Sequence, residues 1–378
     1  MSAPEILISA GEASSDMYAA RLATALQART GARLFGMGGK RMAEAGVELI
    51  VDHHEVAVVG ISEVLHKIPT VIGVQRRLAG EAARRGAALA ILVDSPGTHL
   101  GVARRLKNHG ILVGYFIGPQ VWAWRPGRVP VVKRLVERMV VIFPFEEEIY
   151  RQAGVPVDFV GHPLVDVVRA SASRAEFATR CDLDPNRAIV TLLPGSRRSE
   201  IERHYPLFME ACERLSRGAQ TRGPIQFVLA AAPALGPDLF APYARQGVSV
   251  TRVEGATYDA LAAADCAIVA SGTATVESAL LGTPMVVVYR VSPTSAFVLR
   301  RMVRSPFIAM VNLIAGRRVV PELIQDQFTS AALEEEVRKL LESPGAGDEM
   351  KAGLAEVRAK LGPGGAIERA ADIFARML

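Results

Sequence analysis

The small residues Ser271, Gly272 and Thr273 stand where the backbone itself could bind an anion. An apolar run at 266–270 precedes them, and a short helical stretch and a second apolar run at 285–289 follow. Two continuous apolar strands joined by a short helix predict a βαβ unit in a buried parallel sheet. Small residues at a helix start, on the carboxyl side of a strand, leave N–H groups free for an anionic group. An ordinary βα turn fits the same pattern.

Glu277 lies just inside this predicted helix and adds a carboxylate to the candidate anion site. With a diphosphate on the amides, the carboxylate could accept hydrogen bonds from ribose hydroxyls. Its alternative role is to favour the N-terminal end of the helix. A second turn of this kind contains Gly195, Ser196 and Arg197, directly after the apolar run 188–193. Glycine and serine at a helix start, beside arginine, suit phosphate binding.

Asp94 is the candidate for acid–base chemistry. It follows the apolar run 87–93, so it is predicted at the carboxyl end of a parallel strand, where α/β enzymes bind ligands. The competing interpretation is that Asp94 caps the next helix. Trp122 and Trp124 follow another apolar run at 111–117, and they form either a platform for a sugar or acyl chain or a part of the core.

Apolar runs of strand length recur in both halves of the chain, which at 378 residues is long for a single core. The polar, strandless stretch 164–186 is the predicted linker between two α/β series. The fold class predicted is therefore α/β, with two Rossmann-like domains. The first domain is placed at 1–165 and the second at 166–349, and helices at about 350–378 are expected to pack back on the first.

Composition and known motifs narrow the functional class. No run approaches the roughly 18–20 apolar residues of a membrane span, although the mean hydropathy is +0.22. The widely spaced Cys181, Cys212 and Cys266 predict neither disulfides nor a zinc site, which suits a cytosolic protein. Neither G-x-G-x-x-G nor the P-loop occurs, which argues against a conventional dehydrogenase or NTPase. The Asp182-Leu183-Asp184 triplet precedes a strand instead of ending one, so no metal site is predicted from it.

The charge and two mixed segments point to anionic partners. The net charge is +5 and the pI is near 9.2, which favours phosphates, nucleic acid or an acidic membrane surface. Residues 56–77 and 297–304 combine apolar and basic side chains. The first of these is either a pair of core helices split at Pro69 or a surface that meets lipid.

Nine motifs occur in order along the chain: GEASSD (11–16), VDSPG (93–97), GPQVWAWR (118–125), PFE (144–146), GHPL (161–164), LLPGSRRSEI (192–201), SGTATVESALLGTPMVVVYR (271–290), NLIAGR (312–317) and PELIQ (321–325). Together they resemble the lipid A disaccharide synthase family. The resemblance covers almost the full length. As a set the motifs are highly specific, although any single one is weak.

The resemblance implies an inverting, metal-independent glycosyltransferase of the GT-B fold, in which the parallel sheets of two Rossmann-like domains face a cleft. Such an enzyme joins UDP-2,3-diacylglucosamine to 2,3-diacylglucosamine 1-phosphate (lipid X) and releases UDP and the lipid A disaccharide 1-phosphate. It needs no cofactor. The resemblance also implies a peripheral position on the anionic cytoplasmic face of the inner membrane, and it leaves a homodimer open.

Each matching residue inherits an expected role from its motif. Asp94 would be the general base, with His99 as the nearby substitute, and Arg197 would stabilise the leaving diphosphate. The nucleotide-sugar side would comprise Gly195, Ser196, Ser271, Gly272, Thr273, Glu277, Asn312 and Gln325. The acceptor side would comprise Glu12, Ser14, Asp16, Trp122 and Trp124.

Three positions depart from the usual pattern of the family. Ser15 stands where glycine is common, Thr98-His99 where Phe-Asn is common, and Gly118 where serine is common. All three lie in the N-terminal half, so they bear on the acceptor and its acyl chains and leave the nucleotide side untouched.

Three other classes remain to be separated from this one. A UDP-hexosamine 2-epimerase shares the fold, but it would need carboxylates and a histidine converging on the sugar. A glycosyltransferase for another lipid-linked acceptor, such as a polyprenyl one, normally brings Gly-rich loops that are missing here. A nucleic-acid-binding protein is disfavoured because the arginines are scattered along helices without interleaved aromatics.

Overall fold

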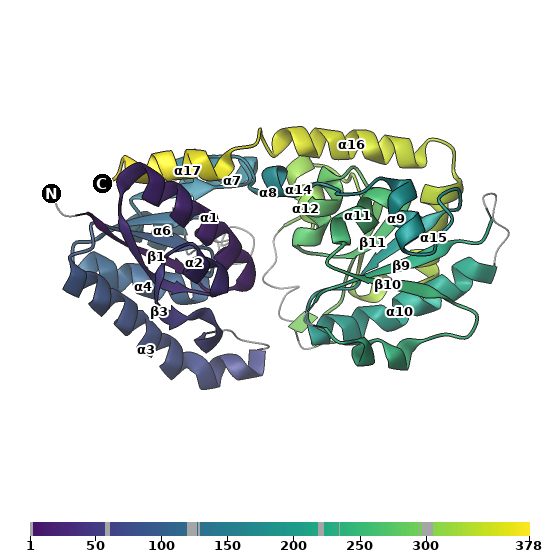
Figure 1. The fold of residues 1–378 in the computed structure, drawn as a ribbon, viewed down its shortest axis with the longest axis horizontal. Coiled ribbons are helices and arrows are strands. Elements are labelled where there is room, and N and C mark those ends of the chain that lie inside the picture. Colours follow the sequence, from purple (N-terminus) through teal and green to yellow (C-terminus); the bar gives the residue numbers. More distant parts are fainter. Residues whose placement is uncertain are drawn as a thin grey trace. The chain divides into compact units, whose positions relative to one another are not determined.

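The computed structural model describes residues 3–56, 61–118, 127, 129–217, 223–233, 235–293, 295–296 and 305–378, with the backbone alone at 61–67 (Figure 1). The chain divides into two compact units, Met1–Pro163 with Leu361–Leu378, and Leu164–Lys360. Each unit has a parallel sheet between helices and its own apolar core. The prediction of two Rossmann-like α/β domains is confirmed.

The described part of the first unit contains a sheet of seven strands in the order β3-β2-β1-β4-β5-β6-β7. All of its neighbouring strands pair in parallel. The central strands are the apolar runs of the sequence, because a parallel sheet covered on both faces buries every side chain. The strands are β1 Glu5–Ala10, β2 Arg33–Gly38, β3 Glu48–Asp52, β4 Leu89–Val93, β5 Leu112–Phe116, β6 Arg138–Val141 and β7 Val157–Phe159.

The helices of the first unit cover this sheet (Figure 1). They are α1 Ala13–Thr30, α2 Lys40–Glu44, α3 Ile61–Arg85, α4 Pro96–Asn108, α6 Val129–Leu135, α7 Pro144–Gln152 and α17 Ala366–Ala375, with the 3₁₀ turn η1 His53–Glu55. Helix α3 runs without a break through Pro69, so the interpretation as a helix pair split at Pro69 is wrong. Among the described residues, no helix has the length and apolar character needed to cross a bilayer.

The second unit repeats the plan with a described sheet of six parallel strands, ordered β10-β9-β8-β11-β12-β13. The strands are β8 Ile189–Leu193, β9 Gln226–Ala231, β10 Val250–Glu254, β11 Cys266–Ala270, β12 Met285–Tyr289 and β13 Glu322–Ile324. The helices are α8 Leu164–Val167, α9 Arg174–Arg180, α10 Arg198–Arg217, α11 Thr257–Ala263, α12 Thr273–Leu280, α14 Met310–Ala315, α15 Ser330–Glu342 and α16 Ala346–Lys360. The described part of this unit also contains the 3₁₀ turns η3 Pro237–Leu239, η4 Ala241–Tyr243 and η5 Gln325–Gln327.

The C-terminal helix α17 returns to the first unit and packs beside α1 (Figure 1). Its Phe374 lies over Gly114 of β5, where an added Cβ would stand 2.5 Å from the ring. Arg29 of α1 bonds Asp372 and Glu368 at 2.5 and 2.6 Å. The return begins at Leu361, not near residue 350, because α16 packs against α12, α14 and α15 of the second unit.

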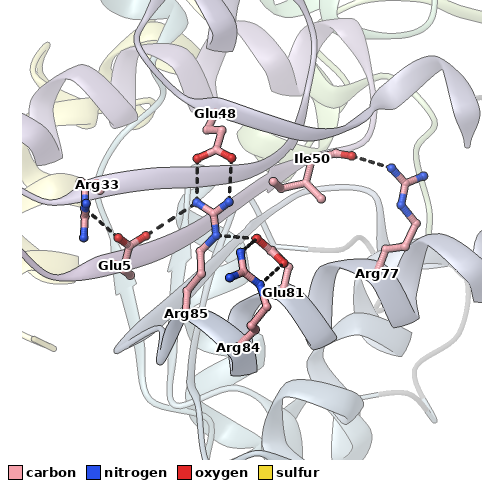
Figure 2. Close-up of polar contacts among 8 residues, drawn as sticks. All are labelled: Glu5, Arg33, Glu48, Ile50, Arg77, Glu81, Arg84 and Arg85. Carbon is pink, nitrogen blue, oxygen red and sulfur yellow. Dashed lines mark hydrogen bonds and ion pairs between the residues drawn. The ribbon is translucent and has the colours of Figure 1, made fainter.

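A network of ion pairs lies at the amino ends of β1 and β3 (Figure 2). Arg85, at the end of α3, contacts Glu48 and Glu81 at 2.7 and 2.6 Å and Glu5 at 3.9 Å. Arg84 adds a second contact to Glu81 at 2.5 Å. We call these five residues the amino-edge network. It connects α3 to β1 and β3, at the edge opposite the carboxyl ends of the strands.

Candidate functional site

The backbone bends sharply where β4 ends, and this bend positions Asp94. Asp94 and Ser95 are consecutive non-glycine residues in the left-handed region, with φ of 53° and 50°. Such a conformation costs about 1–2 kcal/mol per residue, although Asp tolerates it better than most. The Asp94 N–H still bonds Phe116 O of β5 at 3.0 Å, so the chain leaves the ladder only after this residue. Backbone strain of this kind concentrates at functional sites.

The Asp94 carboxyl is half-buried at the carboxyl edge of the first sheet. Burial, with a smaller contribution from the negative charge of Glu12, raises its pKa to about 6, while the Ser95 amide acts in the opposite direction. Among the described residues, neither Asp94 nor Glu12 has an ion-pair partner. A carboxylate with a pKa near 6 is ionised at neutral pH and is a stronger base than an ordinary aspartate.

The turn after β1 contributes Glu12, Ser14 and Asp16, and they differ in what they can contact. Glu12 and Ser14 are exposed. Asp16 is 4% exposed, and its carboxylate accepts the N–H groups of Gly39, Arg41 and Met42 at 2.7–3.3 Å. That bonding gives Asp16 the structural role of holding the start of α2. A direct contact of Asp16 with an acceptor remains a prediction.

His99 is completely buried in the first turn of α4, so it is not placed to act as the base. Its Nδ1 lies 2.7 Å from the Asp94 carbonyl oxygen and its Nε2 lies 2.9 Å from Ser9 Oγ. Burial lowers its pKa to about 4, so the ring is neutral at pH 7. The Tyr115 hydroxyl donates to the same Asp94 carbonyl at 2.5 Å. Both ring nitrogens of His99 are therefore engaged inside the protein.

In the second unit, the turn after β8 already contains an anion of the protein itself. The Glu200 carboxylate accepts the Ser196 and Arg197 N–H groups at 2.9 and 3.2 Å, and the Arg197 guanidinium lies 3.3 Å away. Gly195 has φ of 127°, and an added Cβ there would stand 2.4 Å from Glu200. The amides predicted to bind a phosphate are thus occupied, although Arg197 stays 61% exposed.

The turn after β11 is open instead. Gly272 is the N-cap of α12 with φ of 155°, and no atom of the described part of the chain lies within 4 Å of the position that a Cβ would take. Among the described residues, no acceptor bonds the N–H groups of Thr273 and Ala274, while Ser271 Oγ bonds the Ile308 carbonyl at 3.3 Å. Glu277 is half-buried on the same helix, and burial raises its pKa against a 3.1 Å bond from Tyr258.

Asn312 and Gln325 differ in their freedom to meet a ligand. Asn312 is completely buried, and its amide donates to Val320 O and Glu322 and accepts the N–H groups of Val319 and Val320. With all four positions used, the Asn312 amide holds the loop before β13, and a direct contact with the nucleotide sugar stays a prediction. Gln325 is half-buried with φ of 54°.

Trp122 and Trp124 lie outside the described residues, as does the basic segment 297–304.

The structure gives three residues contacts at the site that sequence reasoning did not assign to them. Tyr115 and His99 bond the Asp94 carbonyl, and Glu200 bonds the amides after Gly195. The spacing of Glu200 from Ser196 could have indicated the last of these, because a carboxylate in the first turn of a helix often bonds the amides before it. Tyr115 gave no such signal, because its partner is 21 residues away.

Comparisons with known proteins agree on one family. A model described as lipid-A-disaccharide synthetase matches residues 6–363. A lipid-A-disaccharide synthase of Myxococcus xanthus (strain DK1622) is 45% identical over 377 residues, covering 99% of this chain and 98% of the relative.

Solved structures with lower identity share the fold. The UDP-GlcNAc 2-epimerase from Neisseria meningitidis bound to UDP-GlcNAc is 12% identical with a TM-score of 0.67, covering 98% of this chain and all of that one. The calicheamicin glycosyltransferase CalG4 is 16% identical with a TM-score of 0.60, covering 100% of this chain and 99% of that one. These likenesses support the GT-B architecture alone.

Proposed function

This chain belongs to the lipid-A-disaccharide synthase family, and we propose that Asp94 is the base of its transfer reaction. It is a glycosyltransferase that forms the lipid A disaccharide from a UDP-sugar and a lipid acceptor. The specific substrates proposed are UDP-2,3-diacylglucosamine and lipid X. The observation that carries the role of Asp94 is its place at the end of a central strand, with a pKa raised to about 6.

The proposed chemistry is a single displacement. A hydroxyl oxygen of the acceptor attacks the anomeric carbon, the new C–O bond forms, and the bond to the diphosphate oxygen breaks. The hydroxyl proton passes to the Asp94 carboxylate, and the bonding pair leaves with UDP. General-base assistance of this kind contributes typically 10²–10⁴-fold.

The nucleotide would be held by the second unit. The N–H groups at the start of α12, at Thr273 and Ala274, bond no acceptor among the described residues, and they suit the diphosphate. Arg197 is exposed and adds a positive charge, whereas the amides of its own turn bond Glu200. This favours the Gly272 turn over the Gly195 turn as the backbone cradle. We assign the ribose to the Glu277 carboxylate, five residues beyond Gly272.

Glu277→Gln tests the ribose assignment, since it keeps the volume and removes the charged acceptor. Affinity for UDP should fall about tenfold or more, because a hydrogen bond to a charged group contributes roughly 1.5–3 kcal/mol. Calorimetry with UDP gives the answer, with the exposed Glu335→Gln on α15 as the matched control. Unchanged affinity in Glu277→Gln would remove the ribose role.

The reaction itself is tested by UDP release from UDP-2,3-diacylglucosamine with and without lipid X. A glycosyltransferase releases UDP in proportion to the disaccharide it forms, and only when the acceptor is present. Isomerised UDP-sugar without dependence on the acceptor would instead indicate an epimerase. The fold alone does not separate the two, because the epimerase shares it at 12% identity.

We also propose that the protein works at the anionic cytoplasmic face of the inner membrane, where its lipid substrates would be found. Ile68 is 46% exposed in α3, within the mixed segment 56–77. Flotation with anionic vesicles should recover the protein at low salt and release part of it at high salt, because salt screens the electrostatic attraction. Ile68→Glu should weaken flotation, and failure of the wild type to float at low salt would contradict docking.

A further inference from the structure

The carbonyl group of Asp94 is held by two donors that belong to different elements. The Tyr115 hydroxyl reaches it from β5 at 2.5 Å, and the His99 Nδ1 reaches it from α4 at 2.7 Å. The N–H of the same residue is held by Phe116 O at 3.0 Å. Hydrogen bonds therefore hold both the N–H and the carbonyl group of Asp94, whose φ of 53° is in the left-handed region.

The orientation of the imidazole follows from its partners. A carbonyl oxygen can only accept, so His99 Nδ1 carries the hydrogen and Nε2 is the acceptor. Ser9 Oγ lies 2.9 Å from Nε2 and donates to it from the middle of the sheet. The histidine thus connects β1 to the carbonyl of Asp94, and the ring stays neutral. A neutral ring places no positive charge beside Asp94, where a cation would make the carboxylate a weaker base.

We propose that His99 is a positioning residue, whose Nδ1–H holds Asp94 in the left-handed conformation that aims its carboxylate. The proposal deepens the role given to Asp94 and rests on it. His99 touches neither substrate in this account, because it is completely buried. Its effect reaches the reaction only through the direction of the Asp94 side chain.

Two substitutions separate this role from simple packing. The side-chain amide of Asn reaches about the place of Nδ1, and that of Gln reaches about the place of Nε2. His99→Asn therefore keeps a donor to Asp94 and loses Ser9, whereas His99→Gln keeps a partner for Ser9 and loses the donor to Asp94. Both remove the aromatic ring, so a packing role predicts similar losses in the two.

The experiment measures kcat and KM for both variants with UDP-2,3-diacylglucosamine and lipid X, and their melting temperatures. His99→Gln should lose kcat by about 10²-fold, the penalty expected for a catalytic group displaced by about 1 Å, with KM for the UDP-sugar little changed. His99→Asn should recover most of that turnover at a similar melting temperature. Equal turnover in the two variants, or a loss confined to KM, would overturn the proposal.

Tyr115→Phe covers the case in which His99→Gln does not fold. It removes the other donor to the Asp94 carbonyl and keeps the ring, so kcat should fall about five- to tenfold, as for one lost hydrogen bond. Unchanged kcat in Tyr115→Phe would count against positioning through the carbonyl. Asp94→Asn in the same assay separates the proposal that Asp94 is the base from the proposal that His99 positions it. Full turnover there would remove Asp94 as the base, whereas an inactive Asp94→Asn beside equal His99 variants would remove only the role of His99.

Discussion

The two edges of the first sheet both carry carboxylates, but the folded protein shifts the pKa values of these carboxylates in opposite directions. At the amino edge, Arg84 holds the pKa of Glu81 down to about 2, with Arg85 contributing, and Arg85 also lowers the pKa of Glu48. At the carboxyl edge, burial and the charge of Glu12 raise the pKa of Asp94 to about 6. The amino-edge network stabilises the fold with paired charges. At the carboxyl edge, the partly desolvated Asp94 carboxylate has no ion-pair partner in the described part of the chain, which keeps it available as a base.

Asp94→Asn should produce the largest effect at the carboxyl edge. The amide cannot take the proton of the attacking hydroxyl, so turnover should fall by about 10²–10⁴-fold, the usual contribution of a general base. UDP affinity should stay close to that of the wild type. Steady-state kinetics and calorimetry measure both. The N-cap of α4 is Ser95, without a side-chain cap bond, so the interpretation of Asp94 as the cap is wrong. If the Asp94 carboxyl only fills its place in the fold, Asn should serve about as well and turnover should be nearly unchanged.

The same substitution should stabilise the protein at alkaline pH. Folding raises the pKa of Asp94 from 3.8 to about 6, so the folded state binds the proton more tightly than the unfolded state. The wild type therefore loses stability as the pH rises through this window, by up to about 3 kcal/mol. Asn does not titrate and avoids that loss.

Melting temperatures at pH 8 and pH 4 measure this difference. Asp94→Asn should melt higher than the wild type at pH 8, and the gap should nearly close at pH 4. The exposed Asp348→Asn in the second unit is the control and should show no such gap. A lower melting temperature for Asp94→Asn at pH 8 would contradict the raised pKa.

At the amino edge, Arg85→Gln should reduce stability and leave the chemistry intact. Arg85 is 17% exposed and contacts three glutamates, so its loss should cost about 1–3 kcal/mol of unfolding free energy. Because the pKa values of Glu48 and Glu81 are lowered on folding, this stabilisation is full above their unfolded pKa, near 4.5, and is lost as the pH falls.

Urea denaturation at pH 7 and pH 3 is the measurement for the amino edge. The deficit of Arg85→Gln should shrink at pH 3, and kcat at pH 7 should match the wild type. Arg84→Gln, which removes a 68% exposed arginine bonded to Glu81, is the matched control with a smaller deficit. A loss of kcat in Arg85→Gln would show that the two edges are not independent.

The fold could be predicted because its central strands are continuous apolar runs, and Asp94 could be located because it follows one of them. The edge strands β3, β7 and β13 escape such a prediction, because they are mostly only partly buried and so do not form continuous apolar runs. Pro69 does not break a helix as its residue type suggests, since α3 continues through it.

The roles of individual polar residues were harder to predict. Asp16 and Asn312 carry the residue types of ligand contacts, yet tertiary hydrogen bonds engage them inside the protein. The Gly39 N–H that Asp16 accepts is 23 residues away along the chain, and no local sequence pattern predicts such a bond. A single side chain also decides whether the amides of a glycine turn are free. After Gly195, the Glu200 carboxylate accepts them, whereas no described residue does so after Gly272.

The central claim is that Asp94 is a base whose pKa is raised at the carboxyl edge. It is tested most directly by the pH dependence of kcat/KM in the wild type and in Glu12→Gln. The acceptor phosphate also titrates near pH 6, so the midpoint of the wild type alone does not identify the group. Removing the charge of Glu12 should lower the pKa of Asp94 and leave the phosphate unaffected. The account predicts an acid limb near pH 6 that moves to lower pH in Glu12→Gln, and a limb that stays in place would contradict it.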